Sequence, residues 1–251
     1  MIRVAASLGL LAAMPALAQE EAPAPGEVMA VYDIVDSVSP GRIESDIRTL
    51  VDFGTRHTAS QTESATRGIG AARRWIHDEF ERISAECGGC LEVVYVSDTI
   101  SGETRLPEPV EVVSVLAIQR GTLDPDRVVM MSGDIDSRVS DVMDAESDSP
   151  GANDNASGVA GAIEAARVLS QHEFAGTIVY AALAGEEQGL FGGEIVADWA
   201  LEQGWRIKGV LNNDMIGNIT GNVTEMIPGE IDAAMPELPT TTGPAVPFKI
   251  P

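Results

Sequence analysis

Five short runs of apolar, largely β-branched residues recur along the 251-residue chain, and segments with helical periodicity separate the later runs. Runs of this length and composition are typical of buried strands. Strands that alternate with helices predict a largely parallel sheet with helices packed on both faces. We therefore expect a doubly wound α/β fold with a mostly parallel sheet. The predicted strands cover residues 91–96, 110–118, 127–131, 177–183 and 209–211, and the helical patterns run through residues 43–51, 69–83, 159–169 and 191–202.

The two ends of the chain differ in composition from its middle. Residues 1–18 combine a short basic start, an apolar stretch and a small-residue cleavage site at Ala16-Leu17-Ala18, which is the pattern of a secretory signal peptide. The composition of residues 19–39 predicts a flexible, acidic and Pro-rich leader. The strand and helix patterns predict the α/β domain at residues 40–222. Residues 223–251 lack an amphipathic period, so we expect an irregular tail and a domain that is C-terminally truncated. We expect a secreted or periplasmic protein without a membrane span.

The balance of charges excludes some partners. The chain has 39 acidic and 16 basic residues, for a formal net charge of −23. Such a charge disfavours binding to nucleic acids and to anionic membranes. It either favours cationic substrates or keeps an exported protein soluble.

The only two cysteines lie close together, at Cys87 and Cys90. In an exported chain this spacing favours a local disulfide over half of a zinc site. A thioredoxin-like redox motif is the alternative, but that motif opens a helix, whereas these cysteines follow one.

Acidic residues follow the predicted strands at the places where catalytic groups collect in open α/β sheets. Each acidic residue has an ordinary structural explanation, such as a helix cap, a turn, a solvated loop or a calcium site. Together they are better explained by a metal site, because adjacent carboxylates raise each other's pKa unless a cation neutralises one of them. The residues are Asp134 and Asp136, then Asp154, then Glu186 and Glu187, and finally Asp214.

Four segments that contain these residues resemble, in order and spacing, the motifs of metallopeptidase family 28, a family of co-catalytic zinc exopeptidases. They are SGDIDSR (132–138), GANDNASGVA (151–160), AGEEQGLFGG (184–193) and NNDMIGN (212–218), and Gly54-Thr55-Arg56-His57-Thr58 is similar to a segment upstream of them. The resemblance covers residues 40–222 and implies a zinc-exopeptidase-like fold.

The resemblance also implies a role for each acidic residue. Asp154 would bridge two zinc ions, Glu187 would bind one of them, and Asp214 and Asp134 the other. Glu186 would be the general base that takes a proton from the attacking water. Asp136 would act in catalysis as a carboxylate that orients the ligand at Asp134.

Two positions depart from the family pattern. Asp134 stands where the family has a histidine, which shifts the preference of the site toward harder ions such as manganese or magnesium. The family's last histidine ligand has no counterpart, since no histidine follows His172. The ion held by Asp154 and Glu187 would then have two protein ligands, and three are usual at a catalytic zinc. His57, His77 and His172 are not expected to be ligands.

We therefore expect an exported metal-dependent exopeptidase of the aminopeptidase type, which acts on a peptide or small amide. One alternative is a noncatalytic or truncated relative that acts by binding. The other is a carboxypeptidase or amidohydrolase that acts on C-terminal or N-acyl residues. The sequence does not indicate an oligomeric state.

Overall fold

The computed structural model describes residues 25–217. The chain divides into two units, the first ending at residue 37 and the second beginning at residue 38. The first unit contributes α1 (Pro25–Asp36), a helix that the Pro-rich composition of the leader did not predict. The signal peptide, residues 19–24 of the leader and the tail at 223–251 lie outside the described residues. The second unit contains α2 (Pro40–Asp52), α3 (Ile69–Glu86), β1 (Leu91–Ile100), β2 (Val110–Gln119), β3 (Asp124–Asp134), η1 (Ala152–Ala156), α4 (Ser157–Leu169), β4 (Gly176–Leu183), α5 (Glu186–Gly189), α6 (Phe191–Glu202) and β5 (Arg206–Asn212).

The sheet has five strands in the order β1-β2-β4-β3-β5, which confirms the α/β fold and each of the five predicted strands. It is mixed, however, and not mostly parallel. The β3–β4 and β3–β5 pairs are parallel, whereas the β1–β2 and β2–β4 pairs are antiparallel. A parallel pair needs a crossover of roughly a dozen residues or more. The segment 101–109 between β1 and β2 is too short for a crossover, so these strands form a hairpin.

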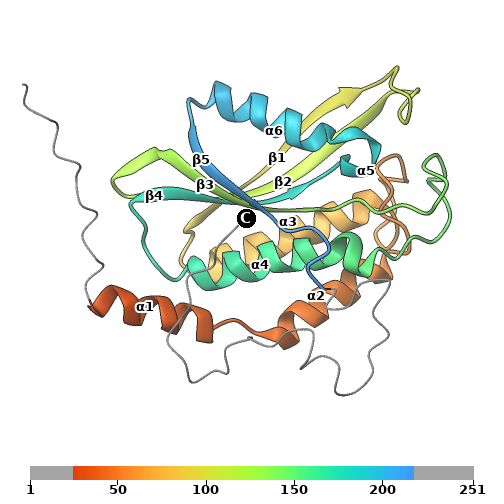
Figure 1. Cartoon of the computed structure of the whole chain (residues 1–251). Coiled ribbons are helices and arrows are strands. Elements are labelled where there is room, and N and C mark those ends of the chain that lie inside the picture. Colours follow the sequence, from red (N-terminus) through yellow and green to blue (C-terminus); the bar gives the residue numbers. More distant parts are fainter. Residues whose placement is uncertain (1–24, 218–251) are drawn as a thin grey trace, which may run out of the picture. The chain divides into compact units, whose positions relative to one another are not determined.

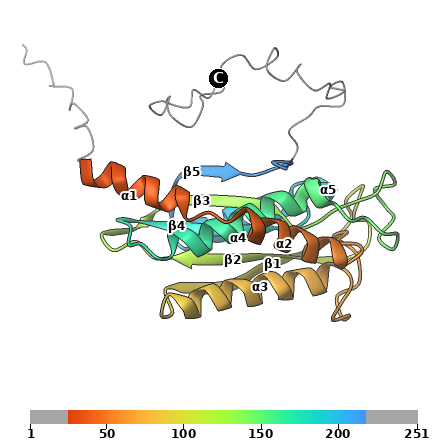
Figure 2. The ribbon, with the colours of Figure 1, turned by 90° about the horizontal axis from the view of Figure 1, so that it is seen from below.

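Helices cover both faces of the sheet, as the sequence predicts (Figure 1). Helices α2, α3 and α4 lie on one face, and α6 lies on the other (Figures 1 and 2). The side chains of β4 alternate between the two cores. Tyr180 and Ala182 pack toward α3 and α4, while Val179 and Ala181 pack toward α6. This double burial explains why the central strands appear in the sequence as continuous apolar runs.

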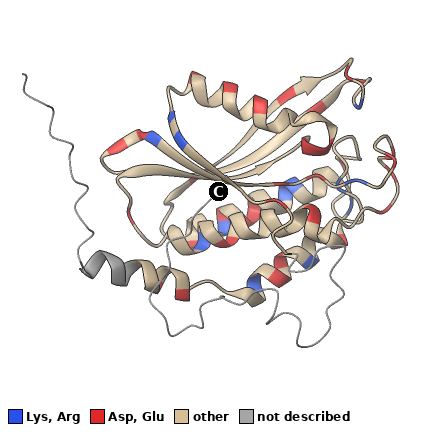
Figure 3. Ribbon diagram, viewed as in Figure 1, with Lys and Arg blue, Asp and Glu red and all other residues tan. Residues whose placement is uncertain are grey.

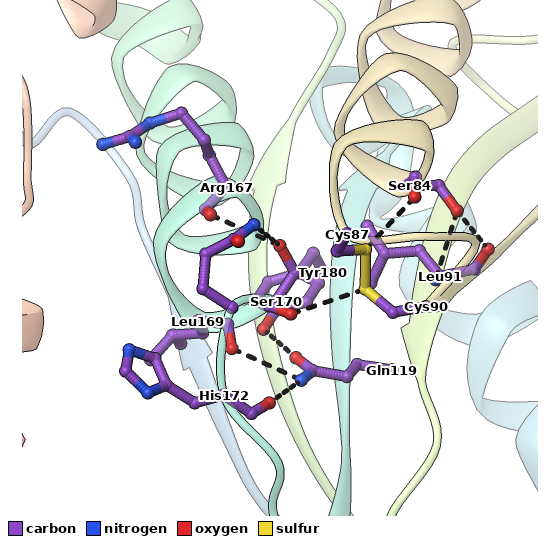
Figure 4. The surroundings of a disulfide bond; sticks show 11 residues. Ser84, Cys87, Cys90, Leu91, Gln119, Arg167, Leu169, Ser170, His172 and Tyr180 are labelled. Carbon is purple, nitrogen blue, oxygen red and sulfur yellow. Dashed lines mark hydrogen bonds between the residues drawn. A yellow bond between two sulfur atoms is a disulfide. The ribbon is translucent and has the colours of Figure 1, made fainter.

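A disulfide closes the turn between α3 and β1. Cys87 and Cys90 are bonded, with their Cα atoms 5.6 Å apart, which confirms the predicted local bridge (Figure 4). Beside it, the Ser84 hydroxyl donates to the Leu91 carbonyl at 2.8 Å and accepts from the Leu91 amide at 3.2 Å. The bridge and this hydrogen-bonded pair fix the start of β1 against the end of α3.

β5 is the last strand of the described sheet, and all of its residues are exposed. Val210 and Leu211 expose 51% and 59% of their surface. Asp214 follows this strand. Within residues 25–217, no helix combines the length and the apolar character that crossing a membrane requires.

Candidate active site

The strand register brings the four acidic segments to one edge of the sheet. Asp134, the last residue of β3, pairs with Leu183, and Ser132 pairs with Asn212. The parallel strands β3, β4 and β5 therefore end side by side, with their acidic loops above them. The start of α4 lies against β3, since a Cβ on Gly133 would come within 2.3 Å of the Gly158 backbone. This close approach requires glycine and brings the Asp154 segment to the same edge.

Asp134 is buried and is held by an asparagine. Its Oδ2 accepts a hydrogen bond of 3.0 Å from Nδ2 of Asn155, which also donates to the Asn213 carbonyl at 2.8 Å. Burial, and next the negative charge of Asp136, raise the pKa of Asp134 to about 6. The Asp134 carboxyl therefore lies in a place where its ionised form is disfavoured unless a cation is near.

Asp136 is 1% exposed and holds the turn that carries the two glutamates. Its Oδ1 accepts from the Glu186 amide at 3.2 Å, and its Oδ2 accepts from the Glu187 amide at 3.1 Å and from the Thr58 hydroxyl at 2.8 Å. Among the described residues, Asn155 donates a hydrogen bond to the Asp134 carboxylate. The role predicted for Asp136 in orienting Asp134 stays a prediction. Asp136 lies two residues beyond the end of β3, where its carboxylate oxygens bond to the Thr58 hydroxyl and to the amides of the α5 turn.

The glutamate pair opens α5, which is separated from β4 by Ala184 and Gly185. Burial, and next the charge of Asp136, raise the pKa of Glu186 to about 7. Burial also raises the pKa of Glu187, against the opposing effect of Arg138. The Arg138 guanidinium donates to the Glu187 carboxylate, and Arg105 donates to the Glu187 carbonyl at 2.5 Å. Figure 3 shows the acidic α5 beside the loops that carry these basic residues.

Asp154 and Asp214 are exposed and lie near each other. Burial, and next the charge of Asp154, raise the pKa of Asp214. Among the described residues, no three His, Cys, Asp or Glu side chains are grouped closely enough to hold a metal ion. The donor chemistry nevertheless suits a divalent cation, since these carboxylates lie at one edge of the sheet, where burial and their negative charges raise the pKa values of Asp134, Glu186 and Asp214. For metal binding, the Glu187 carboxylate would have to turn away from Arg138.

The contacts of His57 and His77 are with groups other than these carboxylates. His57 is buried, and its Nε2 lies 2.6 Å from Gln188 Nε2 and 3.0 Å from the Val142 carbonyl. His77 stacks on Tyr95, with ring centroids 4.7 Å apart. His57 and Thr58 thus support the α5 turn from the segment between α2 and α3. The only sequence signal for this support was the resemblance carried by the GTRHT segment. The segment has no strand or helix period, so its pattern did not indicate which residues it would contact.

A cavity of about 170 Å³ lies between the segment that follows α2 and the connection from β1 to β2. Its walls include His57, Arg105, Leu106, Val110 and Met143. Two of its wall residues contact α5, since His57 lies against Gln188 and Arg105 donates to the Glu187 carbonyl.

The chain is similar in sequence to several known proteins. Residues 114–237 match the model of Peptidase family M28. A probable zinc metalloprotease of Pyrenophora teres f. teres is 47% identical over 200 residues, which are 80% of this chain and 41% of that protein. A probable zinc metalloprotease of Pyricularia oryzae is 48% identical over 191 residues, 76% of this chain and 38% of that protein. The chain thus spans about two fifths of the length of these relatives.

Solved structures show the same fold. The LapA aminopeptidase of Legionella pneumophila matches with a TM-score of 0.60 and 19% identity, over 82% of this chain and 48% of that one. A glutaminyl cyclase of Fimbriiglobus ruber matches with a TM-score of 0.55 and 17% identity, over 70% of this chain and 61% of that one. Proteins of different activities share the fold, so the reaction has to be argued from the site.

Proposed function

Because this chain belongs to peptidase family M28, a family of zinc metallopeptidases, we propose that it is a metal-dependent exopeptidase of the aminopeptidase type. Its substrates would be peptides or small amides. The observation that carries the proposal is the α5 turn, where Asp136 accepts from the amides of both Glu186 and Glu187. This arrangement presents two carboxylates at the end of β4 in a fixed orientation.

The carboxylates at the sheet edge would hold the metal. Asp134 and Asp214 would bind one ion, Glu187 the other, and Asp154 would bridge them. A bound zinc ion supplies Lewis-acid chemistry, by which a carbonyl is polarised and water becomes more acidic. With aspartate at position 134, manganese is a second candidate ion. The number of ions is part of the proposal.

Glu186 is suited to move a proton. Its carboxyl is half-buried beyond the carboxyl end of β4, and no described side chain donates a hydrogen bond to it. It would take a proton from water at one carboxylate oxygen and pass it to the leaving amine. Asp136 supports this step through the backbone, because it fixes the amide of Glu186. The cavity lined by His57 and Arg105 would take a side chain of the substrate.

A noncatalytic relative that acts by binding is the second candidate. It is favoured by the ion pair of Glu187 with Arg138, which occupies a predicted ligand, and by the absence of a grouped metal-ligand set within residues 25–217. In that case the acidic edge would bind a ligand without hydrolysis.

Hydrolysis of a panel of aminoacyl chromogenic amides tests the proposal. The chain would be assayed with zinc or manganese and with a chelator, together with Glu186→Gln and the matched control Glu194→Gln, an exposed glutamate on α6. We expect metal-dependent turnover that falls by a factor of about 10² to 10⁴ in Glu186→Gln and is unchanged in Glu194→Gln. Turnover of N-acyl or C-terminal substrates alone would favour the carboxypeptidase or amidohydrolase alternative. Turnover that is unchanged in Glu186→Gln, as in the control, would contradict the role of Glu186.

We also propose that the protein is exported, on the basis of its signal-peptide pattern at residues 1–18. Expression of the full chain, fractionation of the cells and N-terminal sequencing test this. We expect a mature chain that starts at Gln19 outside the cytoplasm, and an uncleaved cytoplasmic chain would contradict it.

A further inference from the structure

Arg56 is a buried cation that the proposed reaction does not use. It lies between α2 and α3, and its side chain is the largest of the fully buried ones in the described chain, with 1% exposure. Within residues 25–217, no carboxylate forms an ion pair with it. Burial of a charged group without compensation is costly, so its surroundings have to satisfy the guanidinium in another way.

Backbone carbonyls provide this compensation. The guanidinium donates to Ile135 at 2.8 Å, to Pro150 at 2.8 Å, to Gly151 at 2.9 Å and to Leu50 at 2.9 Å. Ile135 lies between the predicted site residues Asp134 and Asp136. Pro150 and Gly151 come shortly before Asp154. One side chain thus joins two of the acidic segments to the end of α2.

The charge of Arg56 also acts on the site. The carboxylates of Asp136 and Asp154 favour the charged form of the guanidinium. Burial opposes them and lowers the pKa of Arg56 to about 10, which leaves the side chain cationic at neutral pH. A fixed positive charge behind the acidic edge reduces the repulsion between carboxylates when they are brought together.

We propose that Arg56 is a positioning residue that sets the separation of the Asp134–Asp136 segment from the Asp154 segment and thereby the affinity for the metal. The inference rests on the proposed function. It depends on the fork of the guanidinium, because three nitrogens reach carbonyls that lie in different directions. A lysine keeps the charge but has one nitrogen, which cannot bond to Ile135 and Gly151 in the same way.

The test compares Arg56→Lys with the matched control Arg74→Lys. Arg74 also donates to two backbone carbonyls, those of Thr62, at 2.7 Å, and Ser64, but none of its hydrogen bonds reaches an acidic segment. Zinc and manganese affinities would be measured by titration calorimetry, with thermal unfolding as a measure of the fold. We expect a metal Kd at least ten-fold weaker in Arg56→Lys and unchanged in Arg74→Lys. At saturating metal, kcat should fall in Arg56→Lys while KM stays within two-fold.

The outcomes separate this inference from the proposed function. A wild-type chain that binds neither ion overturns both. Wild-type binding with an unchanged Kd in Arg56→Lys overturns the inference alone, as does an equal loss of affinity in Arg74→Lys. If Arg56→Lys does not fold, Ser137→Ala carries the test, because the Ser137 hydroxyl accepts from the Arg56 amide at 3.3 Å. We expect a two- to five-fold weaker Kd in Ser137→Ala, and an unchanged Kd would overturn the inference.

Discussion

The middle of the sheet and its β5 edge carry different parts of the candidate site in very different surroundings. Asp134 ends β3, Asp136 follows it, and both are buried, whereas Asp214 follows a strand whose residues are all exposed. Asp136 is satisfied by three hydrogen bonds from Thr58 and the α5 turn. On the edge, the position of Asp214 depends on hydrogen bonds of its neighbours, such as Asn213 to Ser132 at 2.8 Å. The central part of the candidate site is therefore buried and held by hydrogen bonds of its own carboxylates, whereas the edge part is exposed and held through hydrogen bonds of neighbouring residues.

The largest expected difference between the two regions is in stability. Ile118 on β2 is fully buried, and Ile118→Ala should lower the free energy of unfolding by about 4 kcal/mol through lost burial and a cavity. Leu211 on β5 is mostly exposed, and Leu211→Ala should lower it by less than about 0.5 kcal/mol. Urea denaturation of both variants measures this. Similar losses would show that β5 is packed as firmly as the centre.

Asn155 joins the two regions and should have an intermediate effect. Its side-chain amide bonds to Asp134 and to the Asn213 carbonyl, and its Oδ1 accepts from the Gly158 amide at 3.0 Å. Asn155→Ala should cost about 2 kcal/mol, because it leaves buried polar groups without partners. The control is Asn153→Ala, which removes a single acceptor of the exposed Gly217 amide and should cost less than about 1 kcal/mol. Equal costs in the two denaturation curves would contradict the bridging role.

The smallest effect is expected in the helical layer, away from both regions. Burial, and next the charge of Glu79, raise the pKa of Asp46 on α2 from 3.8 to about 6, and no group within residues 25–217 bonds to Asp46 Oδ2. The folded state thus binds this proton more tightly than the unfolded state does. The contribution of Asp46 to stability is fully present below pH 3.8 and is lost as the pH rises through 6.

Asp46→Asn should consequently stabilise the protein at pH 7, by on the order of 1–2 kcal/mol, and leave stability nearly unchanged near pH 4. Thermal unfolding at both pH values measures this. Asp52→Asn, at an exposed position at the end of the same helix, is the control and should change little. A stability gain that is the same at both pH values would assign the effect to helix propensity instead of the pKa of Asp46.

The sequence predicted the elements that have a strong period. All five strands and the helices α2, α3, α4 and α6 lie where the apolar patterns place them, because burial on one or both faces leaves that pattern in the residues. The antiparallel hairpin of β1 and β2 was missed, since both strands are apolar enough to suit a parallel sheet. The helix α1 was missed because the prolines and acidic residues around it indicated a leader.

The acidic residues of the candidate site were also visible in the sequence, since each follows a strand or opens a helix. The side chains that hold these acidic residues in place were not visible in the sequence. Arg56, His57 and Asn155 act across long sequence separations, and no local pattern indicates which carbonyl or carboxylate such a side chain will meet. For the same reason the sequence did not indicate that Asp136 would bond to Thr58 and to the α5 turn, and its predicted role in orienting Asp134 stays a prediction.

Crystals of the chain grown with zinc, with anomalous diffraction measured at the zinc edge, would test the proposed metal centre without an assay. We predict anomalous peaks between the carboxylates of Asp134, Asp154, Glu187 and Asp214, with Glu187 turned away from Arg138. A map without a peak at this edge of the sheet, in crystals that keep the ion pair of Glu187 and Arg138, would contradict the assignment of these residues as metal ligands.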